Sequence, residues 1–210
     1  MLLSMETLDP KPESDCYDKP VWTLGGLLGE LPGLPGHLAR VAGTSVGHPI
    51  SGQLRERIML AVTAVNRCDY CRLAHTTFAR SEGLADGEIQ NILDGVDLAQ
   101  DPGESAALAY VRDLARRRFA SRDEALWERL LRHYRDPQRD AIDSSARVIN
   151  LANRFGNTFD AARERLSGRC ENTEASALDL TVVSSLFAVG AALVSPVVGT
   201  LMLLQSARRR

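Results

Sequence analysis

The sequence predicts an all-α fold, and three features of the chain point to it. From residue 51 to about residue 155, apolar side chains recur every three or four residues, the period that places them on one face of a helix. No run of alternating apolar and polar residues is convincing as a strand. Residues that favour helix ends, such as Ser, Pro and Gly, separate the apolar stripes. With 210 residues, 44% of them hydrophobic, the chain can bury one substantial core.

Residues 1–50 are predicted to form a Pro/Gly-rich N-terminal arm with short helical turns. Pro and Gly recur throughout this stretch. The segment Leu24–Leu34 is apolar enough to dock on the core or on another subunit. No residue of the arm suggests chemistry, so we expect it to serve packing or assembly.

Two helices follow the arm. Ser51 can cap a helix that runs to about Asn66. A turn at Cys68 or Asp69 then starts a second helix, which Gly83 closes. Cys68 is therefore expected at or near a helix N-terminus, where backbone N–H groups favour a thiolate.

Four further helices are predicted to complete a thiol-redox domain at residues 51–166. They span Asp86–Leu93, Glu104–Phe119, Ser121–Tyr134 and a segment that Pro137 opens. Ser121 and Glu124 match a capping box at the third of these helices, and Gly156 is expected to interrupt the last. Their apolar stripes are typical of helix faces packed on a core. Residues 167–179 then form a linker.

The spacing of Cys68, Cys71 and His75 predicts redox chemistry. Cys71 and His75 are four residues apart, so on a helix the thiol and the imidazole share one face and can meet. A neighbouring imidazolium lowers the pKa of a thiol from its usual value of about 8.5 and makes it nucleophilic at neutral pH. The two-residue spacer lets one sulfur attack a substrate while the other closes a disulfide.

Structural interpretations of the cysteine pair compete with this one. A zinc site needs a second pair of ligands at similar spacing, and none is evident, so no metal is expected. The other candidate ligands lie singly along the chain: Cys16, Cys170, His37, His48 and His133. Covalent haem attachment needs His directly after the second Cys, where this chain has Arg72. Two buried, inert cysteines stay open as an alternative.

Together with Glu56 in the preceding helix, the motif resembles the active-site pattern of the alkylhydroperoxidase D and carboxymuconolactone decarboxylase superfamily. The order and spacing of Glu56, Cys68, Cys71 and His75 match that pattern. The segment Ala79–Leu84 and the asparagine-rich stretch Val148–Thr158 are also similar to superfamily members. The resemblance covers roughly residues 20–166 and implies a helical bundle that assembles into a homo-oligomer.

The resemblance implies a thiol-dependent peroxidase that reduces hydroperoxides. In the peroxidase branch, Cys71 would attack the peroxide O–O bond and become a sulfenic acid, and Cys68 would resolve it as a disulfide. Glu56 and His75 would serve as the proton relay. Tyr70 stands where the well-described peroxidase has a His. Tyrosine donates a hydrogen bond at neutral pH but is a poor base, so its part in the relay is an open question.

Two other functions stay open. The decarboxylase branch resembles the same fold but does not depend on paired cysteines. A module that senses redox state, or passes electrons to a partner, would use the thiol pair without turning over peroxide. The chain has no glycine motif for nucleotides in a strand-to-helix setting, so an external dithiol protein is the expected reductant and no cofactor is needed. A net charge of −2 gives no general field for nucleic acid.

The second unusual feature of the chain is its hydrophobic C-terminal segment, residues 180–207. It contains no charged residue, is long enough to cross a bilayer of ~30 Å, and is followed by Arg208–Arg210. It predicts either a membrane anchor or a helix or hairpin buried in an oligomer and broken at Ser195–Pro196. The start of the chain lacks a signal-peptide pattern, and the cysteines do not form a secreted framework. A cytoplasmic location is therefore predicted, with membrane association through residues 180–207 left open.

Overall fold

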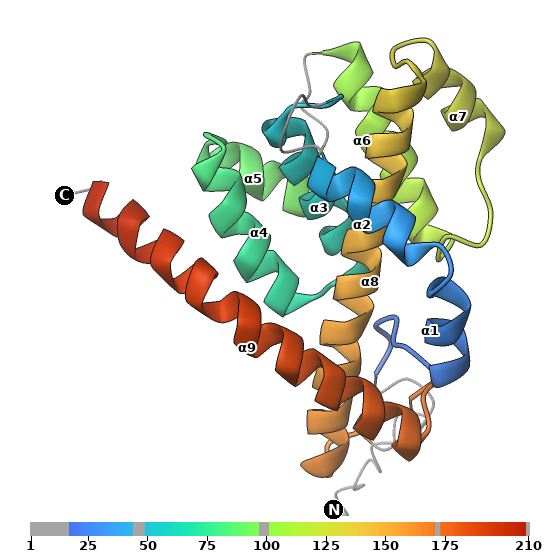
Figure 1. The fold of residues 1–210 in the computed structure, drawn as a ribbon, viewed down its shortest axis with the longest axis vertical. Helices are drawn as coiled ribbons and strands as arrows, with labels where there is room; N and C mark the ends of the chain where they lie inside the picture. The colour runs from blue at the N-terminus through green and yellow to red at the C-terminus, as the bar shows by residue number, and fades with distance from the viewer. Residues whose placement is uncertain (1–16, 44–48, 97–100, 171–172, 209–210) are drawn as a thin grey trace, which may run out of the picture.

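The structure, a computed structural model, describes residues 17–43, 49–96, 101–170 and 173–208. Within these ranges all regular secondary structure is helical, which confirms the predicted all-α fold (Figure 1). The helices are α1 (Leu24–Glu30), α2 (Leu34–Gly43), α3 (Gly52–Asn66), α4 (Asp69–Ser81), α5 (Asp86–Leu93), α6 (Pro102–Arg116), α7 (Glu124–Leu131), α8 (Asp136–Leu166) and α9 (Ala177–Arg208).

Helix α3 lies at the centre of the bundle, in contact with α4, α5, α6 and α8. Its side chains are fully enclosed on more than one side of the helix, at Ile58, Leu60 and Val62. Burying an aliphatic side chain of this size contributes about 1.5–3 kcal/mol relative to leaving it exposed. The core therefore fixes α3, and with it the surfaces that α4 and α8 present to each other.

The turn between α3 and α4 forms as the sequence predicts. The Ser51 hydroxyl accepts the Leu54 N–H at the start of α3. Arg67 follows the end of α3 in the left-handed conformation, with φ of 55°, and Cys68 is the N-cap residue of α4. The N-cap position of Cys68 confirms that this thiol lies at a helix N-terminus.

The predicted capping box at Ser121 and Glu124 is wrong. Helix α7 begins at Glu124, and the Asp123 carboxylate caps it by accepting the Leu126 N–H. The preceding helix ends earlier than expected because Phe119 takes a positive φ and its N–H bonds back to the Leu114 carbonyl. That turn leaves Asp123, a strong N-cap residue, in place to start α7.

The predicted interruption of α8 at Gly156 is wrong. The helix runs unbroken from Asp136 to Leu166. A Cβ atom at position 156 would lie 2.6 Å from the Cys68 sulfur, so the glycine serves the close approach of α4 to α8. Glycine inside a helix lowers its stability by about 1 kcal/mol relative to alanine. At position 156 the missing Cβ leaves room for the Cys68 thiol.

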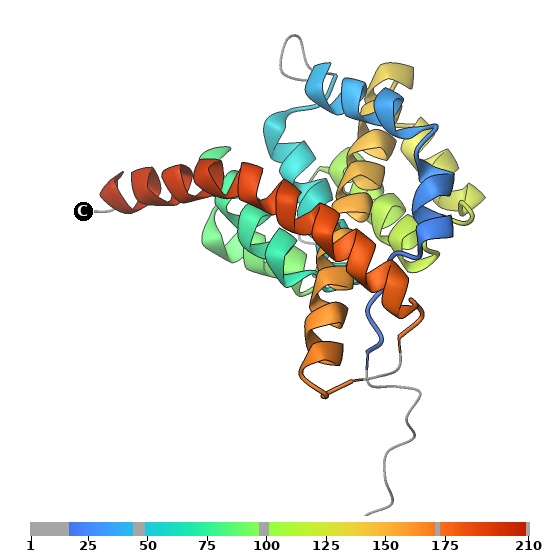
Figure 2. The same ribbon diagram turned by 60° about the horizontal axis from the view of Figure 1, so that its bottom comes forward.

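Helix α9 is longer and straighter than predicted. It starts at Ala177, within the expected linker, and continues through Pro196, so the predicted break at Ser195–Pro196 is wrong. It packs against α8 and α4, and its C-terminal half runs out past the bundle (Figures 1 and 2). Leu180 and Val183 are buried, whereas Leu186 is exposed.

The predicted membrane association of residues 180–207 concerns the same helix, α9. In the part of the chain that the structure describes, no helix is both long and apolar enough to cross a membrane.

The N-terminal arm contains an extended strap, residues 17–23, followed by α1 and α2. The strap lies along α8: the Trp22 N–H donates to Thr158 Oγ1 at 2.8 Å, and the Trp22 indole donates to the Leu151 carbonyl at 3.1 Å. The Arg154 guanidinium stacks 3.5 Å from the centroid of the Trp22 ring. Residues 1–16 and 44–48 of the predicted arm lie outside the described residues.

Candidate active site

Cys68 and Cys71 are free thiols at the start of α4. The Cys68 backbone is extended, and its Sγ accepts the Cys71 backbone N–H at 3.4 Å. Both residues are buried, with exposed fractions of 1% for Cys68 and 8% for Cys71. The unpaired N–H groups at a helix N-terminus stabilise negative charge on the capping atom, here the Cys68 sulfur.

The pKa values of the two thiols shift in opposite directions. A hydrogen bond from the Cys71 thiol lowers the pKa of Cys68; burial opposes this, and the backbone N–H groups of Cys71 and Tyr70 and the charge of Lys19 reinforce it. Donating that hydrogen bond, together with burial, raises the pKa of Cys71. The local structure therefore favours a Cys68 thiolate beside a Cys71 thiol.

Glu56 on α3 and His75, which lies one turn along α4 from Cys71, form a second pair. His75 Nδ1 lies 2.8 Å from Glu56 Oε2, and Glu56 is only 3% exposed. Arg55 Nε lies 3.4 Å from the other carboxylate oxygen. Within the described part of the chain, the His75 ring bonds to Glu56, and no hydrogen bond joins it to Cys71. The site thus consists of two neighbouring pairs, one of sulfurs and one of proton-exchanging groups.

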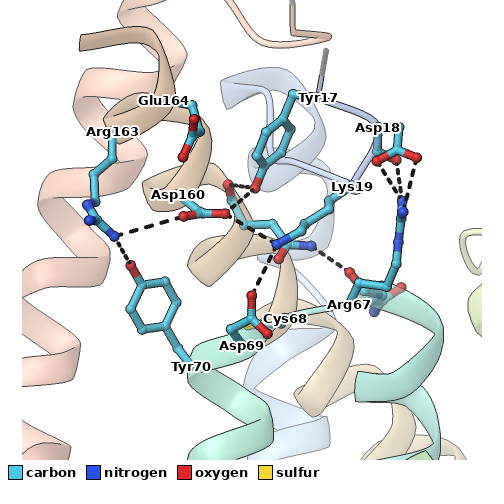
Figure 3. A network of polar contacts seen from close by, with 12 residues as sticks. Tyr17, Asp18, Lys19, Arg67, Cys68, Asp69, Tyr70, Asp160, Arg163 and Glu164 are labelled. Atoms are coloured by element: carbon cyan, nitrogen blue, oxygen red, sulfur yellow. Dashed lines mark hydrogen bonds and ion pairs between the residues drawn. The ribbon is translucent and has the colours of Figure 1, made fainter. Parts of the chain in front are cut away.

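Tyr70 anchors the start of α4 to α8 and α9. Its hydroxyl accepts a hydrogen bond from Arg163 Nη1 at 3.1 Å (Figure 3). Its ring centroid lies 5.8 Å from that of Phe159 on α8 and 5.4 Å from that of Phe187 on α9. These contacts hold the hydroxyl beside Arg163, and they support a packing role at this position.

Asparagines on one face of α8 hold the α3–α4 turn in place. Asn66 Nδ2 donates to Asn150 Oδ1 at 3.0 Å, and Thr63 Oγ1 donates to Asn153 Oδ1 at 3.1 Å. Asn157 Nδ2 donates to the Asn66 carbonyl at 2.8 Å. All of these groups are buried. Since a buried polar group without a partner costs about 1–3 kcal/mol, this set of bonds keeps the turn that carries Cys68 in one position.

A pocket of about 280 Å³ opens beside Cys68. Charged side chains of the strap, the turn and α4 line it: Lys19, Arg67, Asp69 and Arg72. Lys19 Nζ lies 3.3 Å from Asp69 Oδ2 and 3.3 Å from Asp160 Oδ2 (Figure 3). The pocket offers a small molecule a polar route toward the Cys68 end of the thiol pair.

Sequence reasoning missed Lys19 and Gly156. A lysine in a Pro/Gly-rich arm carries no signal of its own, because its place beside Cys68 is set by the docking of the strap on α8. Gly156 did carry a signal, because a glycine within a helical pattern often marks close approach of another backbone or side chain. The same signal also fits a helix interruption, which α8 does not have.

The remaining candidate ligands lie away from the thiol pair. His37 Nδ1 lies 3.1 Å from Ser144 Oγ, and His133 is exposed. Cys170 is buried and disulfide-bonded. Cys16 and His48 lie outside the described residues. Among the residues that are described, no three His, Cys, Asp or Glu side chains gather in a way that could hold a metal ion.

Comparison with known proteins supports the expected relationship. No curated protein matches the chain. Residues 32–113 match the model of the Carboxymuconolactone decarboxylase family. The matched segment contains α3 and α4, and so all of Glu56, Cys68, Cys71 and His75, while the strap and α7–α9 lie outside it. Residues 32–113 are therefore similar to the Carboxymuconolactone decarboxylase family, which is part of the alkylhydroperoxidase D-like superfamily.

Proposed function

We propose that the protein is a thiol-dependent oxidoreductase of the peroxidase type, which reduces hydroperoxides through a dithiol–disulfide cycle of Cys68 and Cys71. The observation that carries this proposal is the pair of free thiols at the α4 N-terminus, with the Cys71 N–H on the Cys68 sulfur at 3.4 Å. The pair of buried Glu56 and half-buried His75 lies nearby, with His75 one helical turn from Cys71. A thiolate, a second thiol and a proton relay are the groups that this chemistry requires.

The cycle moves two electrons from the sulfurs to the peroxide. A thiolate attacks one peroxide oxygen, the O–O bond breaks, and the departing alkoxide takes up a proton. The resulting sulfenic acid is attacked by the second sulfur, the disulfide forms and water leaves. An external dithiol protein then reduces the disulfide and restores both thiols.

Glu56 and His75 suit the transfer of protons in this cycle. The Glu56 carboxylate accepts a hydrogen bond from the Nδ1 position of His75 and so favours the tautomer in which Nε2 is free to accept a proton. The same carboxylate stabilises the imidazolium that forms when Nε2 takes that proton. His75 would thus return a proton to the alkoxide or to the departing hydroxide.

Assembly into a homo-oligomer is a further part of the proposal. Leu178, Leu186 and Val189 on α9 are 64%, 54% and 65% exposed, an apolar set that a second subunit could cover.

A redox-sensing module is the second candidate function, and the burial of both thiols favours it. A sulfur that is 1% exposed reacts slowly with bulky oxidants, as a slow sensor would. The two functions differ in turnover: a sensor forms the disulfide once, whereas a peroxidase consumes peroxide for as long as a dithiol donor lasts. A decarboxylase of the same family would act on a lactone carboxylate without either sulfur.

Steady-state peroxide consumption with a dithiol donor tests the proposal. Wild type should show saturable turnover, and a Cys68→Ser, Cys71→Ser double variant should show none. Glu56→Gln should slow turnover by about 10²–10⁴-fold, the usual contribution of a positioned acid–base group. Glu82→Gln is the matched control, because Glu82 also pairs with Arg55 but lies at the surface. Equal turnover in wild type and the double variant would overturn the proposal.

A further inference from the structure

The strap brings a lysine into the thiol site from outside the segment that matches the family. Arg67 binds the strap through Asp18, with its Nη1 3.0 Å from the carboxylate and its Nη2 2.9 Å from the backbone carbonyl. Asn157 Nδ2 donates to the Pro20 carbonyl at 3.1 Å. Through these contacts, the strap is joined both to the turn before Cys68 and to α8.

Lys19 is held between two carboxylates at this point of the strap. Its Nζ bridges Asp69 on α4 and Asp160 on α8, at 3.3 Å from each (Figure 3). Burial opposes its charge, but the hydrogen bonds and charge of Asp160 and Asp69 outweigh burial, so the pKa of Lys19 lies above its usual value. Lys19 is therefore a fixed cation beside the residue that follows Cys68.

The titratable groups around Cys68 come from three elements. They include Tyr17 and Lys19 of the strap, Asp69, Tyr70 and Cys71 of α4, and Asp160, Arg163 and Glu164 of α8. Burial and the neighbouring Asp160 raise the pKa of Tyr17, which keeps its phenol neutral. Arg67 and Arg72 line the same pocket and pair with Asp18 and Asp69, just as Lys19 pairs with Asp69 and Asp160. Lys19 is thus the cation at this site that the strap contributes.

We propose that Lys19 is a positioning residue of the thiol site, whose charge at the α4 N-terminus keeps the negative charge of the reduced pair on Cys68. Three observations carry the assignment. Cys68 Sγ occupies the N-cap position and accepts the Cys71 N–H. Lys19 and Cys68 line one pocket. Over the described ranges of the chain, no hydrogen bond joins the His75 ring to the Cys71 thiol, so His75 does not hold a negative charge on Cys71.

If the protein is a peroxidase, as the proposed function states, a negative charge on Cys68 assigns the first step of the cycle to Cys68. The Cys68 sulfur bonds to a peroxide oxygen as the O–O bond breaks, and the alkoxide takes the proton of the Cys71 thiol. The Cys71 thiolate then attacks the Cys68 sulfenic sulfur, so the S–S bond forms as the S–O bond breaks. The departing hydroxide takes up from solvent the proton that Cys68 released on ionising, and it leaves as water. This order is the reverse of the one that the family resemblance implies. Cys68 is the more enclosed of the two residues, and it lines the pocket together with Lys19, so this pocket is the route that we assign to the peroxide.

The ultraviolet absorbance of thiolates, followed against pH in the reduced full-length protein, tests the assignment without any peroxide. The Cys68→Ser, Cys71→Ser double variant supplies the baseline. Lys19→Met should raise the midpoint of the thiolate transition by about one pH unit, the effect of removing one nearby cation. Alkylation by iodoacetamide at neutral pH should slow by up to about tenfold. An unchanged midpoint in Lys19→Met would overturn the role of Lys19.

Two further variants separate charge from the docking of the strap. Lys19→Arg keeps the cation and should retain most of the wild-type midpoint. Asp18→Asn cuts the ion pair between the strap and Arg67 but leaves Lys19 in place, so its midpoint should match wild type. A shift in Asp18→Asn as large as that in Lys19→Met would show that strap docking alone matters and would overturn the proposal.

Single-cysteine variants test which sulfur holds the charge. In the Cys71→Ser variant, the remaining Cys68 thiol should have a pKa below the usual thiol value. In the Cys68→Ser variant, the remaining Cys71 thiol should have a pKa above it. The opposite ranking would overturn the assignment. Because absorbance requires no turnover, a protein with a Lys19-dependent thiolate but no peroxide consumption would contradict the proposed function and leave this inference intact.

Discussion

Gly156→Ala should destabilise the protein and disturb its thiol pair. The added Cβ would lie 2.6 Å from the Cys68 sulfur, 3.4 Å from Cδ2 of Tyr70 and 3.8 Å from Cε2 of Phe187. A carbon and a sulfur need at least about 3.5 Å of separation, so the thiol or the helix must move by about 1 Å. Overpacking of this kind costs about 1–3 kcal/mol, and displacing an N-cap atom costs about 0.5–2 kcal/mol more.

The helix preference of alanine offsets about 1 kcal/mol of that loss. The expected net loss is therefore about 0.5–4 kcal/mol in the free energy of unfolding, which urea denaturation can measure. Gly87→Ala is the matched control, because position 87 lies in α5 and no atom comes within 4 Å of the added Cβ. That variant should be neutral or slightly more stable than wild type.

A double-mutant cycle identifies the cause of the loss. In a Cys68→Ala background the sulfur is absent, so Gly156→Ala should cost less than it does in wild type. A Gly156→Ala protein as stable as wild type, with an unchanged thiolate transition, would refute the claim that this glycine makes room for Cys68.

Three other outcomes are expected. Tyr70→Phe keeps the ring packing and removes only the hydrogen bond from Arg163, so peroxide turnover should stay within about threefold of wild type; a loss of 10²-fold or more, the contribution of an acid–base group, would place the hydroxyl in the relay. Asn157→Ala leaves two carbonyl groups without their donor and should lower the free energy of unfolding by about 1–3 kcal/mol; urea denaturation showing no loss would contradict this. Because the pKa of Cys68 is lowered, its alkylation rate should stay at its plateau to a pH below the usual thiol pKa of about 8.5 and fall only as Cys68 is protonated; a rate that still climbs through that value would contradict a stabilised thiolate.

Local patterns in the sequence predict the framework of the site well. Ser51 and Asn66 mark the ends of α3, and the motif between residues 68 and 75 places one thiol at the start of α4, because capping and helical period depend on near neighbours in the chain. The pair that Glu56 forms with His75 follows instead from the family resemblance, which implies that both residues belong to one proton relay. Capping and helical period need no knowledge of the tertiary packing.

The failures share a different physical cause. Lys19 reaches Cys68 because the strap docks on α8, and Gly156 meets the sulfur because α4 crosses α8 at that point. Both depend on contacts between segments more than 80 residues apart in the chain, which no local pattern carries. His75 shows the same limit: helical spacing allows it to meet Cys71, and the buried carboxylate on α3 draws its ring to Glu56.

A single peroxide pulse on the reduced protein tests the central claim most directly. The account predicts that one equivalent of hydroperoxide removes two thiols, that peptide mapping finds them as a disulfide between Cys68 and Cys71, and that a dithiol donor restores both. Retention of both thiols after the pulse, or formation of a disulfide other than the one between Cys68 and Cys71, would contradict the dithiol–disulfide cycle.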